Sequence, residues 1–250
     1  MTARKPKNIS ASIRQRLLNR ARNDKRPFNE LLQYYAMERF LYRLSQSKHV
    51  DCFILKGALM LRVWRSPEIR PTLDIDMLGQ TSNDEASIIA QIKNIIAVDI
   101  EPDGLVFNPD SIRVERITEE ADYEGIRVRF TGILNTAHVH MQVDIGFGDI
   151  VHPKPMKEEL PTLLDSPAPK LLCYSRESAI AEKFEAMLKL DKLNSRMKDF
   201  YDIWLLSRQF DFEGDTLTES IRLTLGHRGT PIPKTITAFT KAFIAAKHIQ

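Results

Sequence analysis

The chain has 250 residues and a mass of 28.8 kDa, and its 43% hydrophobic and 28% charged residues are ordinary for a globular protein and exclude a disordered chain. The mean hydropathy is -0.28, and no apolar run approaches the roughly 18 residues that a membrane span needs. The basic N-terminus lacks the apolar stretch of a secretory signal. We therefore expect a cytoplasmic protein of one large domain or two small ones.

The net charge of +3 is unevenly distributed. Residues 1–26 contain nine Lys or Arg and the single acid Asp24, a net charge of +8. This segment is suited to contact RNA or DNA phosphates, and a solvated basic helix is an equally good interpretation. The two cysteines, Cys52 and Cys173, lie in apolar segments without metal-ligand spacing, so we interpret them as reduced packing residues.

Hydrophobic spacing predicts a change from mixed to purely helical structure along the chain. The first part is predicted to hold helices over 10–24, with Ser10 as N-cap, and 28–47, a strand over 52–55, a helix over 58–64, a strand over 72–77, a helix over 85–96 and strands ending with 138–147. We expect these strands to form one mixed sheet.

The second part begins with five prolines between Pro153 and Pro169, which predict a linker or an extended crossing because neither a helix interior nor a central strand accepts them. Helices are predicted beyond it over 176–190, 195–209, 216–225 and 233–247. The sequence thus predicts an α+β fold with an N-terminal helical segment (1–48), a core with the sheet (49–160) and a helical C-terminal domain (161–250).

Two aspartates, Asp74 and Asp76, lie two residues apart in a predicted strand. The two-residue period of a strand places both carboxylates on one face. The apolar residues are predicted to lie on the other face: Leu73, Ile75 and Met77. Like charges this close are unfavourable without a cation, and hard carboxylate oxygens suit Mg²⁺ or Mn²⁺. A solvated strand face is the alternative interpretation.

A second polar strand face adds a third carboxylate. Alternation in HVHMQVDI places His138, His140, Gln142 and Asp144 together. In nucleotidyl transfer, two carboxylates on one strand and a third on a neighbouring strand can hold two metal ions, so Asp144 is predicted to act on the nucleophile. A strand-end residue bonded to turn amides is the alternative. The His pair also allows a zinc site, but no third His or Cys stands nearby, which favours an exposed polar face.

A glycine turn precedes the aspartates. In FILKGALML a buried strand reaches Lys56 and Gly57 and leads into a predicted helix. Glycine permits close backbone approach, and a helix N-terminus presents free amides to phosphate. The position of this turn just before the Asp74–Asp76 strand indicates a phosphate-binding site.

Several segments, in this order, carry a resemblance to a known family: LKGALMLRVW, RPTLDIDMLG, VDIGFG, RESAIAEKFEAML and RMKDFYDIWLLSR. Over roughly residues 50–210 the chain resembles the AbiEii/AbiGii nucleotidyltransferase toxins of bacterial toxin-antitoxin systems. The resemblance implies a nucleotidyltransferase-like mixed β-sheet flanked by helices, a helical C-terminal domain, Mg²⁺-dependent transfer from a nucleoside triphosphate (NTP), and a cognate antitoxin protein. Some relatives add nucleotides to tRNA 3′ ends, which implies an RNA acceptor.

The resemblance also implies roles for single residues. Gly57 matches the glycine of the phosphate turn, with Lys56 and Ala58 beside it. Asp74 and Asp76 match the metal pair, and Asp144 matches the third acid. Lys183 matches the lysine that contacts the nucleotide, and Asp199 matches an acid that many relatives require. The family usually has a second Gly or Ser where this chain has Ala58. This departure removes a hydroxyl contact and is expected to weaken or alter triphosphate binding.

Helical spacing supports the assignment of Lys183 and Asp199. Lys183 lies beside the apolar stripe of its helix and faces another direction, although a surface ion pair is the alternative. Asp199 and Asp202 stand one turn apart on one face of the next helix. We expect Asp199 to orient Lys183, and Asp202 to form an ordinary ion pair with Lys198.

These features predict an enzyme that binds an NTP with Mg²⁺ between the sheet and the helical domain and transfers the nucleotide to RNA, with pyrophosphate leaving. Two alternatives stay open. One is a nucleotide- or RNA-binding protein without turnover, its site degraded at Ala58. The other is a metal-dependent phosphoesterase that uses His138 and His140.

Overall fold

The computed structural model describes residues 8–66, 71–119, 123–190 and 197–240. Contacts divide the chain into two units, one of residues 1–148 and 157–173 that holds most of the sheet, and one of residues 149–156 and 174–250 that holds the last helices. The mixed α/β architecture confirms the predicted α+β fold. The division into three segments at residues 48 and 160 stays a prediction. None of the described helices combines the length and apolarity that crossing a membrane demands.

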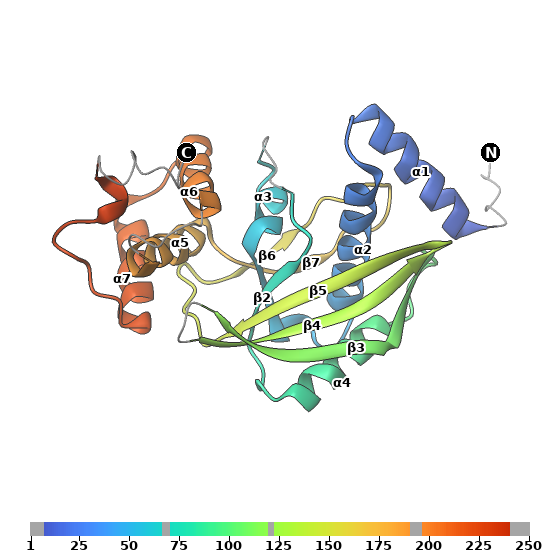
Figure 1. Ribbon diagram of the computed structural model, residues 1–250, viewed down its shortest axis with the longest axis horizontal. Helices are drawn as coiled ribbons and strands as arrows, with labels where there is room; N and C mark the ends of the chain where they lie inside the picture. The colour runs from blue at the N-terminus through green and yellow to red at the C-terminus, as the bar shows by residue number, and fades with distance from the viewer. Residues whose placement is uncertain (1–7, 67–70, 120–122, 191–196, 241–250) are drawn as a thin grey trace. The chain divides into compact units, whose positions relative to one another are not determined.

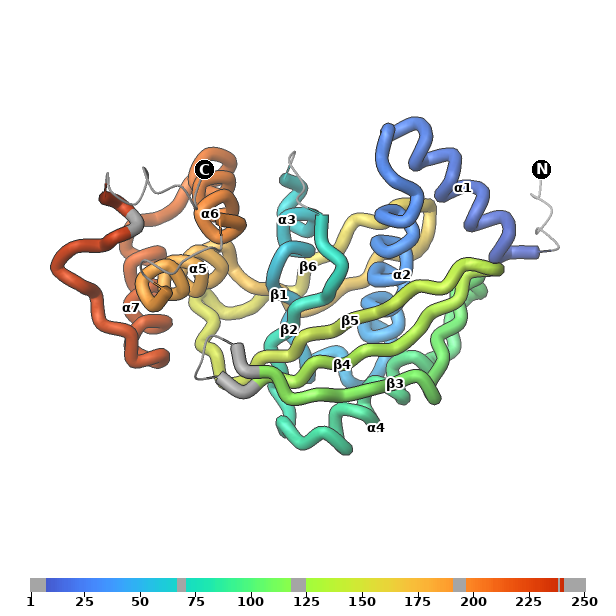
Figure 2. The backbone as a smooth tube through the Cα atoms, viewed as in Figure 1, coloured from blue at the N-terminus to red at the C-terminus, as the bar shows by residue number. Residues whose placement is uncertain are grey.

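A seven-stranded mixed sheet forms the centre of the first unit, in the order β3-β4-β5-β2-β1-β7-β6 (Figure 1). The strands are β1 Phe53–Lys56, β2 Ile75–Gly79, β3 Leu105–Glu119, β4 Tyr123–Leu134, β5 Ala137–Phe147, β6 Met156–Glu159 and β7 Lys170–Cys173. The three long strands β3, β4 and β5 run side by side (Figure 2). β2 pairs in parallel with β5 and antiparallel with β1, so three segments distant in sequence meet at β2.

Helices cover the sheet and supply much of the core. Those of the first unit are α1 Ile9–Asn23, α2 Phe28–Ser45, α3 Met60–Val63 and α4 Glu85–Ile96, with short 3₁₀ turns at Val50–Cys52 and Gly57–Leu59. The α2 side chain of Phe40 packs its ring 5.4 Å from that of Phe130 and 6.2 Å from that of Phe107. Burying a Phe side chain stabilises a fold by about 1.5–3 kcal/mol, so this cluster holds α2 against β3 and β4.

Several predicted boundaries are wrong by a few residues. α1 begins after Asn8, whose side chain accepts a hydrogen bond from the Ala11 amide at 3.0 Å, and Ser10, the predicted N-cap, lies inside the helix and donates its hydroxyl to Asn8. Asn caps a helix at least as well as Ser, and the predicted N-cap at Ser10 is wrong by two residues. The predicted helix over 58–64 is a 3₁₀ turn followed by the four-residue α3.

The predicted alternation around the aspartates begins later than expected. β2 starts at Ile75, and Ile75 and Met77 are buried as predicted, but the side chain of Leu73 is 69% exposed and Thr72 is buried. The two-residue period applies only where the backbone is a paired strand. The prediction that Leu73 lies on the apolar face is therefore wrong.

Three arginines of the basic N-terminal segment form contacts within the first unit. Arg16 pairs with Asp165 at 2.9 Å, Arg20 with Asp24 at 3.1 Å, and the Arg14 guanidinium lies 5.4 Å from the centre of the Phe28 ring. These contacts give the described part of the segment a structural role, and contact between the segment and RNA or DNA phosphates stays a prediction.

A buried acid on α2 makes the stability of the first unit depend on pH. Glu38 is buried, accepts a hydrogen bond from the Leu163 amide at 2.6 Å and lies 3.2 Å from Arg39. Desolvation by burial outweighs these contacts and raises the pKa of Glu38 to about 7. The folded protein therefore keeps a proton here that the unfolded chain releases near pH 4.5. The stability of the fold falls as the pH rises from 4.5 to about 7, and the loss is complete above pH 7.

We expect Glu38→Gln to gain stability relative to the wild type as the pH rises from 5 to 8, by about 2 kcal/mol, because Gln removes the titration and keeps an acceptor for the Leu163 amide. Urea unfolding of both proteins at several pH values measures this difference. Glu101→Gln, at an exposed acid, serves as the control. A difference between Glu38→Gln and wild type that does not change with pH would contradict the prediction.

The second unit is helical, as predicted. Its helices are α5 Arg176–Leu190, α6 Met197–Gln209 and α7 Gly214–Arg228, followed by a 3₁₀ turn at Thr237–Phe239. The predicted helix over 233–247 is wrong for residues 233–236, which are not helical, and residues 241–247 lie outside the described part of the chain. Arg228 ties this unit together through ion pairs with Asp149 at 2.9 Å and Glu185 at 2.8 Å.

Candidate active site

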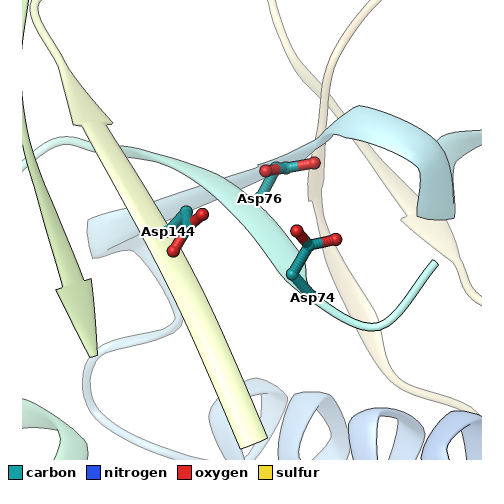
Figure 3. Close-up of side chains that lie close together, drawn as sticks. All are labelled: Asp74, Asp76 and Asp144. Carbon is teal, nitrogen blue, oxygen red and sulfur yellow. The ribbon is translucent and has the colours of Figure 1, made fainter. Parts of the chain in front are cut away.

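Three carboxylates meet where β2 lies beside β5. Asp76 and Asp144 are register partners of the parallel β2–β5 pair, and Asp74 comes just before β2. One carboxylate oxygen from each lies within 4.8 Å of the others, and the side chains turn toward a shared space (Figure 3). Asp144 is buried, while Asp74 and Asp76 are half-buried. The structure therefore brings the three predicted metal ligands together.

Two neighbours hold Asp144: Arg127, which sequence reasoning missed, and Gln142, which was predicted to share its strand face. Arg127 on β4, its register partner, donates two hydrogen bonds to the two carboxylate oxygens at 2.8 and 2.7 Å. Gln142 donates a third at 3.2 Å. These bonds with Asp144 raise the pKa of Arg127, with smaller contributions from Glu115 and Asp74. Asp144 is thus fixed by a bidentate pair and is more than a strand-end residue bonded to turn amides.

The glycine of the predicted phosphate turn is required by its contact with Asp76. Gly57 has a φ of +72°, and a Cβ atom built on it would lie 1.9 Å from Asp76 Oδ2. Any side chain here would displace the Asp76 carboxylate. Lys56 stands opposite Asp76 across the β1–β2 pair and is buried, as is Ala58. The nucleotide-binding roles of Lys56, Gly57 and Ala58 stay predictions.

The donor set fits a divalent cation of the magnesium type. All three side chains offer carboxylate oxygens, the ligands that Mg²⁺ and Mn²⁺ prefer. Arg127 neutralises one of the three charges, which leaves repulsion between carboxylates for a cation to offset. A carboxylate has about four lone-pair sites, and Asp144 accepts three hydrogen bonds from Arg127 and Gln142, so it keeps capacity for a metal.

The two histidines do not form a metal site of this kind. Both His138 and His140 are exposed on β5. In the described part of the chain, the aspartate cluster is the group of three or more possible ligands that lie close enough together to hold a metal. It includes neither histidine. This arrangement fits the exposed polar strand face expected from the sequence.

Lys183 and Asp199 lie together in the second unit. The Lys183 ammonium is 3.1 Å from Asp199 Oδ1 and 2.8 Å from Asp202 Oδ2, and both carboxylates are buried. Asp199 on α6 thus contacts Lys183 on α5, the contact through which Asp199 was expected to orient Lys183. Asp202 also pairs with Lys183, and the expected ion pair between Asp202 and Lys198 stays a prediction.

Removing the Lys183 charge is expected to lower the free energy of unfolding as well as the activity. Lys183→Met would remove the cation that pairs with the buried carboxylates of Asp199 and Asp202, at a cost of about 3–5 kcal/mol. Urea unfolding checks this, with Lys198→Met on the exposed face of α6 as the control. A loss below about 1 kcal/mol, the range of an exposed ion pair, would contradict a buried structural role.

Comparison with protein families decides the assignment of the chain. Residues 39–250 match the model of the family described as nucleotidyl transferase AbiEii toxin, type IV toxin-antitoxin system. The chain belongs to the AbiEii family. It is thus a nucleotidyltransferase, in a family whose reaction uses an NTP and a divalent metal and whose toxins have an antitoxin partner. No curated protein matches the chain.

Two solved structures from Helicobacter pylori are similar to this AbiEii family member. JHP933 has 16% sequence identity and a TM-score of 0.46, with 76% of this chain and 72% of JHP933 covered. A candidate nucleotidyltransferase has 13% identity and a TM-score of 0.47, with 88% and 90% of the two chains covered.

Proposed function

We propose that this AbiEii protein is a Mg²⁺-dependent nucleotidyltransferase that adds nucleotides to RNA, with tRNA 3′ ends as the first acceptor to test, and that it acts as the toxin of a toxin-antitoxin pair. The observation that carries the proposal is the convergence of Asp74, Asp76 and Asp144 within 4.8 Å in a chain that matches the family. Mn²⁺ has the same preference for oxygen ligands and would substitute for Mg²⁺.

In this proposal the three aspartates hold the metal. When bound, divalent cations neutralise the triphosphate and activate the attacking hydroxyl. The protein contributes alignment: Arg127 and Gln142 fix the orientation of Asp144, and Thr72 donates its hydroxyl to Asp74. Gly57 leaves the space that the Asp76 carboxylate occupies. Side chains held in this way need little rearrangement when the substrates bind.

The remaining predicted residues have separate roles. We propose that Lys56, Gly57 and Ala58 contact the triphosphate and that Lys183 contacts the nucleotide. Asp199 supports this role of Lys183 by pairing with it at 3.1 Å, and Asp202 does so at 2.8 Å. Asp144, on the β5 side of the cluster, acts on the acceptor hydroxyl.

Expression in bacteria tests the function in its biological setting. Wild type and Asp76→Asn are induced from the same vector, growth is followed, and the 3′ ends of total RNA are sequenced. The proposal predicts arrested growth and extended RNA 3′ ends with the wild type alone. Equal growth together with identical RNA ends would reject a toxic RNA nucleotidyltransferase, whereas growth arrest with unchanged RNA ends would reject the RNA acceptor.

A further inference from the structure

A pocket of about 830 Å³ opens beside the aspartate cluster, within the first unit. Leu73 and Asp74, just before β2, are part of its wall, and the rest comes from the start of α2 and from β3, β4 and β5. The volume lies in the range of small-molecule and nucleotide sites. Both histidines of the H-x-H pair, which the metal cluster does not use, lie in its lining.

The pocket exists because β5 extends beyond β2. β4 pairs with β5 from Ala137 to Ile145, whereas β2 pairs with it, among the described residues, only over Val143–Phe147. Gln33 of α2 fills part of this gap and donates hydrogen bonds at 3.0 Å to the carbonyl oxygens of Leu73 and His140. It thereby fixes the segment before β2, and with it Asp74, at the border of the pocket.

The pocket wall is rich in groups that bind phosphate and ribose oxygens. His138, His140 and Gln142 alternate along β5. Arg129, on β4, lies opposite Gln142 of β5 and donates a hydrogen bond to the Gln142 side-chain oxygen at 3.2 Å. The Arg129 side chain is half-exposed and pairs with Glu115 at 2.7 Å. Guanidinium and side-chain amide N–H groups are common donors to the phosphate and sugar oxygens of a nucleic acid, and an imidazole N–H can donate in the same way.

The sheet order separates this pocket from the glycine turn. Gly57 follows β1, on one side of β2, while the pocket lies over β5 and β4, on the other side. From His138 to Asp144 the strand spans six residues, or ~20 Å, and leads from the far end of the pocket to the metal cluster. If the triphosphate binds at the glycine turn, the pocket along β5 is free to bind the second substrate.

We propose that the pocket beside Asp74 holds the terminal nucleotides of the RNA acceptor, with His138, His140 and Arg129 contacting its ribose and phosphate oxygens. The inference rests on the proposed transfer to RNA and adds the place where that substrate binds. It gives the H-x-H pair a role in substrate positioning.

Steady-state kinetics with the full chain test the inference. His138→Ala with His140→Ala, and separately Arg129→Ala, are compared with wild type, with KM measured for the RNA and for the NTP in turn. Each variant is expected to raise the KM for RNA about tenfold or more and to leave the KM for NTP within about twofold. The matched control is Arg116→Ala, a half-exposed β3 arginine that pairs with Glu85 at 3.2 Å and lies outside the pocket lining.

The outcomes separate this inference from the proposed function. Wild-type transfer to RNA with an unchanged KM for RNA in the pocket variants would reject the pocket and keep the function. A rise in the KM for NTP instead would assign the pocket to the nucleotide and also reject the inference. A wild type that labels no RNA would reject both. His140→Gln keeps an N–H donor and a polar side chain at this position of β5. It is therefore expected to retain more RNA affinity than His140→Ala.

Discussion

Replacing Asp76 by Asn is expected to lower kcat/KM for nucleotide transfer by about 10³-fold while the protein stays folded, because the loss of one metal-holding charge removes several kcal/mol of transition-state stabilisation. Asp76 is the central member of the cluster: it pairs in register with Asp144 and touches the backbone of Gly57. Incorporation of a labelled nucleotide into RNA by the purified variant measures the effect.

The matched control for Asp76→Asn is Asp110→Asn, which makes the same change at an exposed residue of β3. It is expected to keep wild-type activity within about twofold, the scatter of an exposed substitution without contact to the site. Transfer by Asp76→Asn at more than a tenth of the wild-type rate would show that the cluster does not hold the catalytic metal.

Gly57→Ala is expected to abolish most activity through its contact with Asp76. The added Cβ would lie 1.9 Å from Asp76 Oδ2, so the carboxylate has to move, and a displacement of about 1 Å costs on the order of 10²-fold in rate. The φ of +72° adds about 1–3 kcal/mol of backbone strain for a residue with a side chain. Transfer assays and thermal unfolding measure the two effects.

Gly226→Ala is the control for the glycine change itself. Gly226 lies in α7, and a Cβ built there meets no atom within 4 Å. We expect this variant to keep full activity and to gain about 0.5–1 kcal/mol, since Ala is the better helix former. If Gly57→Ala behaved like Gly226→Ala, the turn would have no role in positioning Asp76.

The sequence contained enough information to predict the sheet, most helices and the meeting of the three aspartates. Alternation sufficed for Asp76 and Asp144, which lie in β2 and β5 between buried apolar neighbours. Asp74 lies just before β2, where the strand period does not apply, and it joins the other two because it is close to Asp76 in sequence. The helix over Glu85–Ile96 has its predicted bounds, and that over Arg176–Leu190 begins at the predicted residue, because apolar periodicity and flanking polar residues mark these ends.

The residues that sequence reasoning missed depend on register and on contacts between elements. Arg127 reaches Asp144 because β4 and β5 pair with these two residues opposite each other, and no local pattern fixes that register. Its position on the polar face of a strand next to β5 was the available signal. Asp202 meets Lys183 only through the packing of α6 against α5. Leu73 is exposed because the paired strand begins two residues later.

Metal binding tests the central claim most directly. Mn²⁺, whose unpaired electrons make the free ion visible by electron paramagnetic resonance, is titrated into wild type and Asp76→Asn with a non-hydrolysable NTP analogue present. We predict that the wild type removes free Mn²⁺ from solution together with the analogue and that the variant binds at least tenfold more weakly. Equal Mn²⁺ binding by the two proteins would contradict a catalytic metal held by Asp74, Asp76 and Asp144.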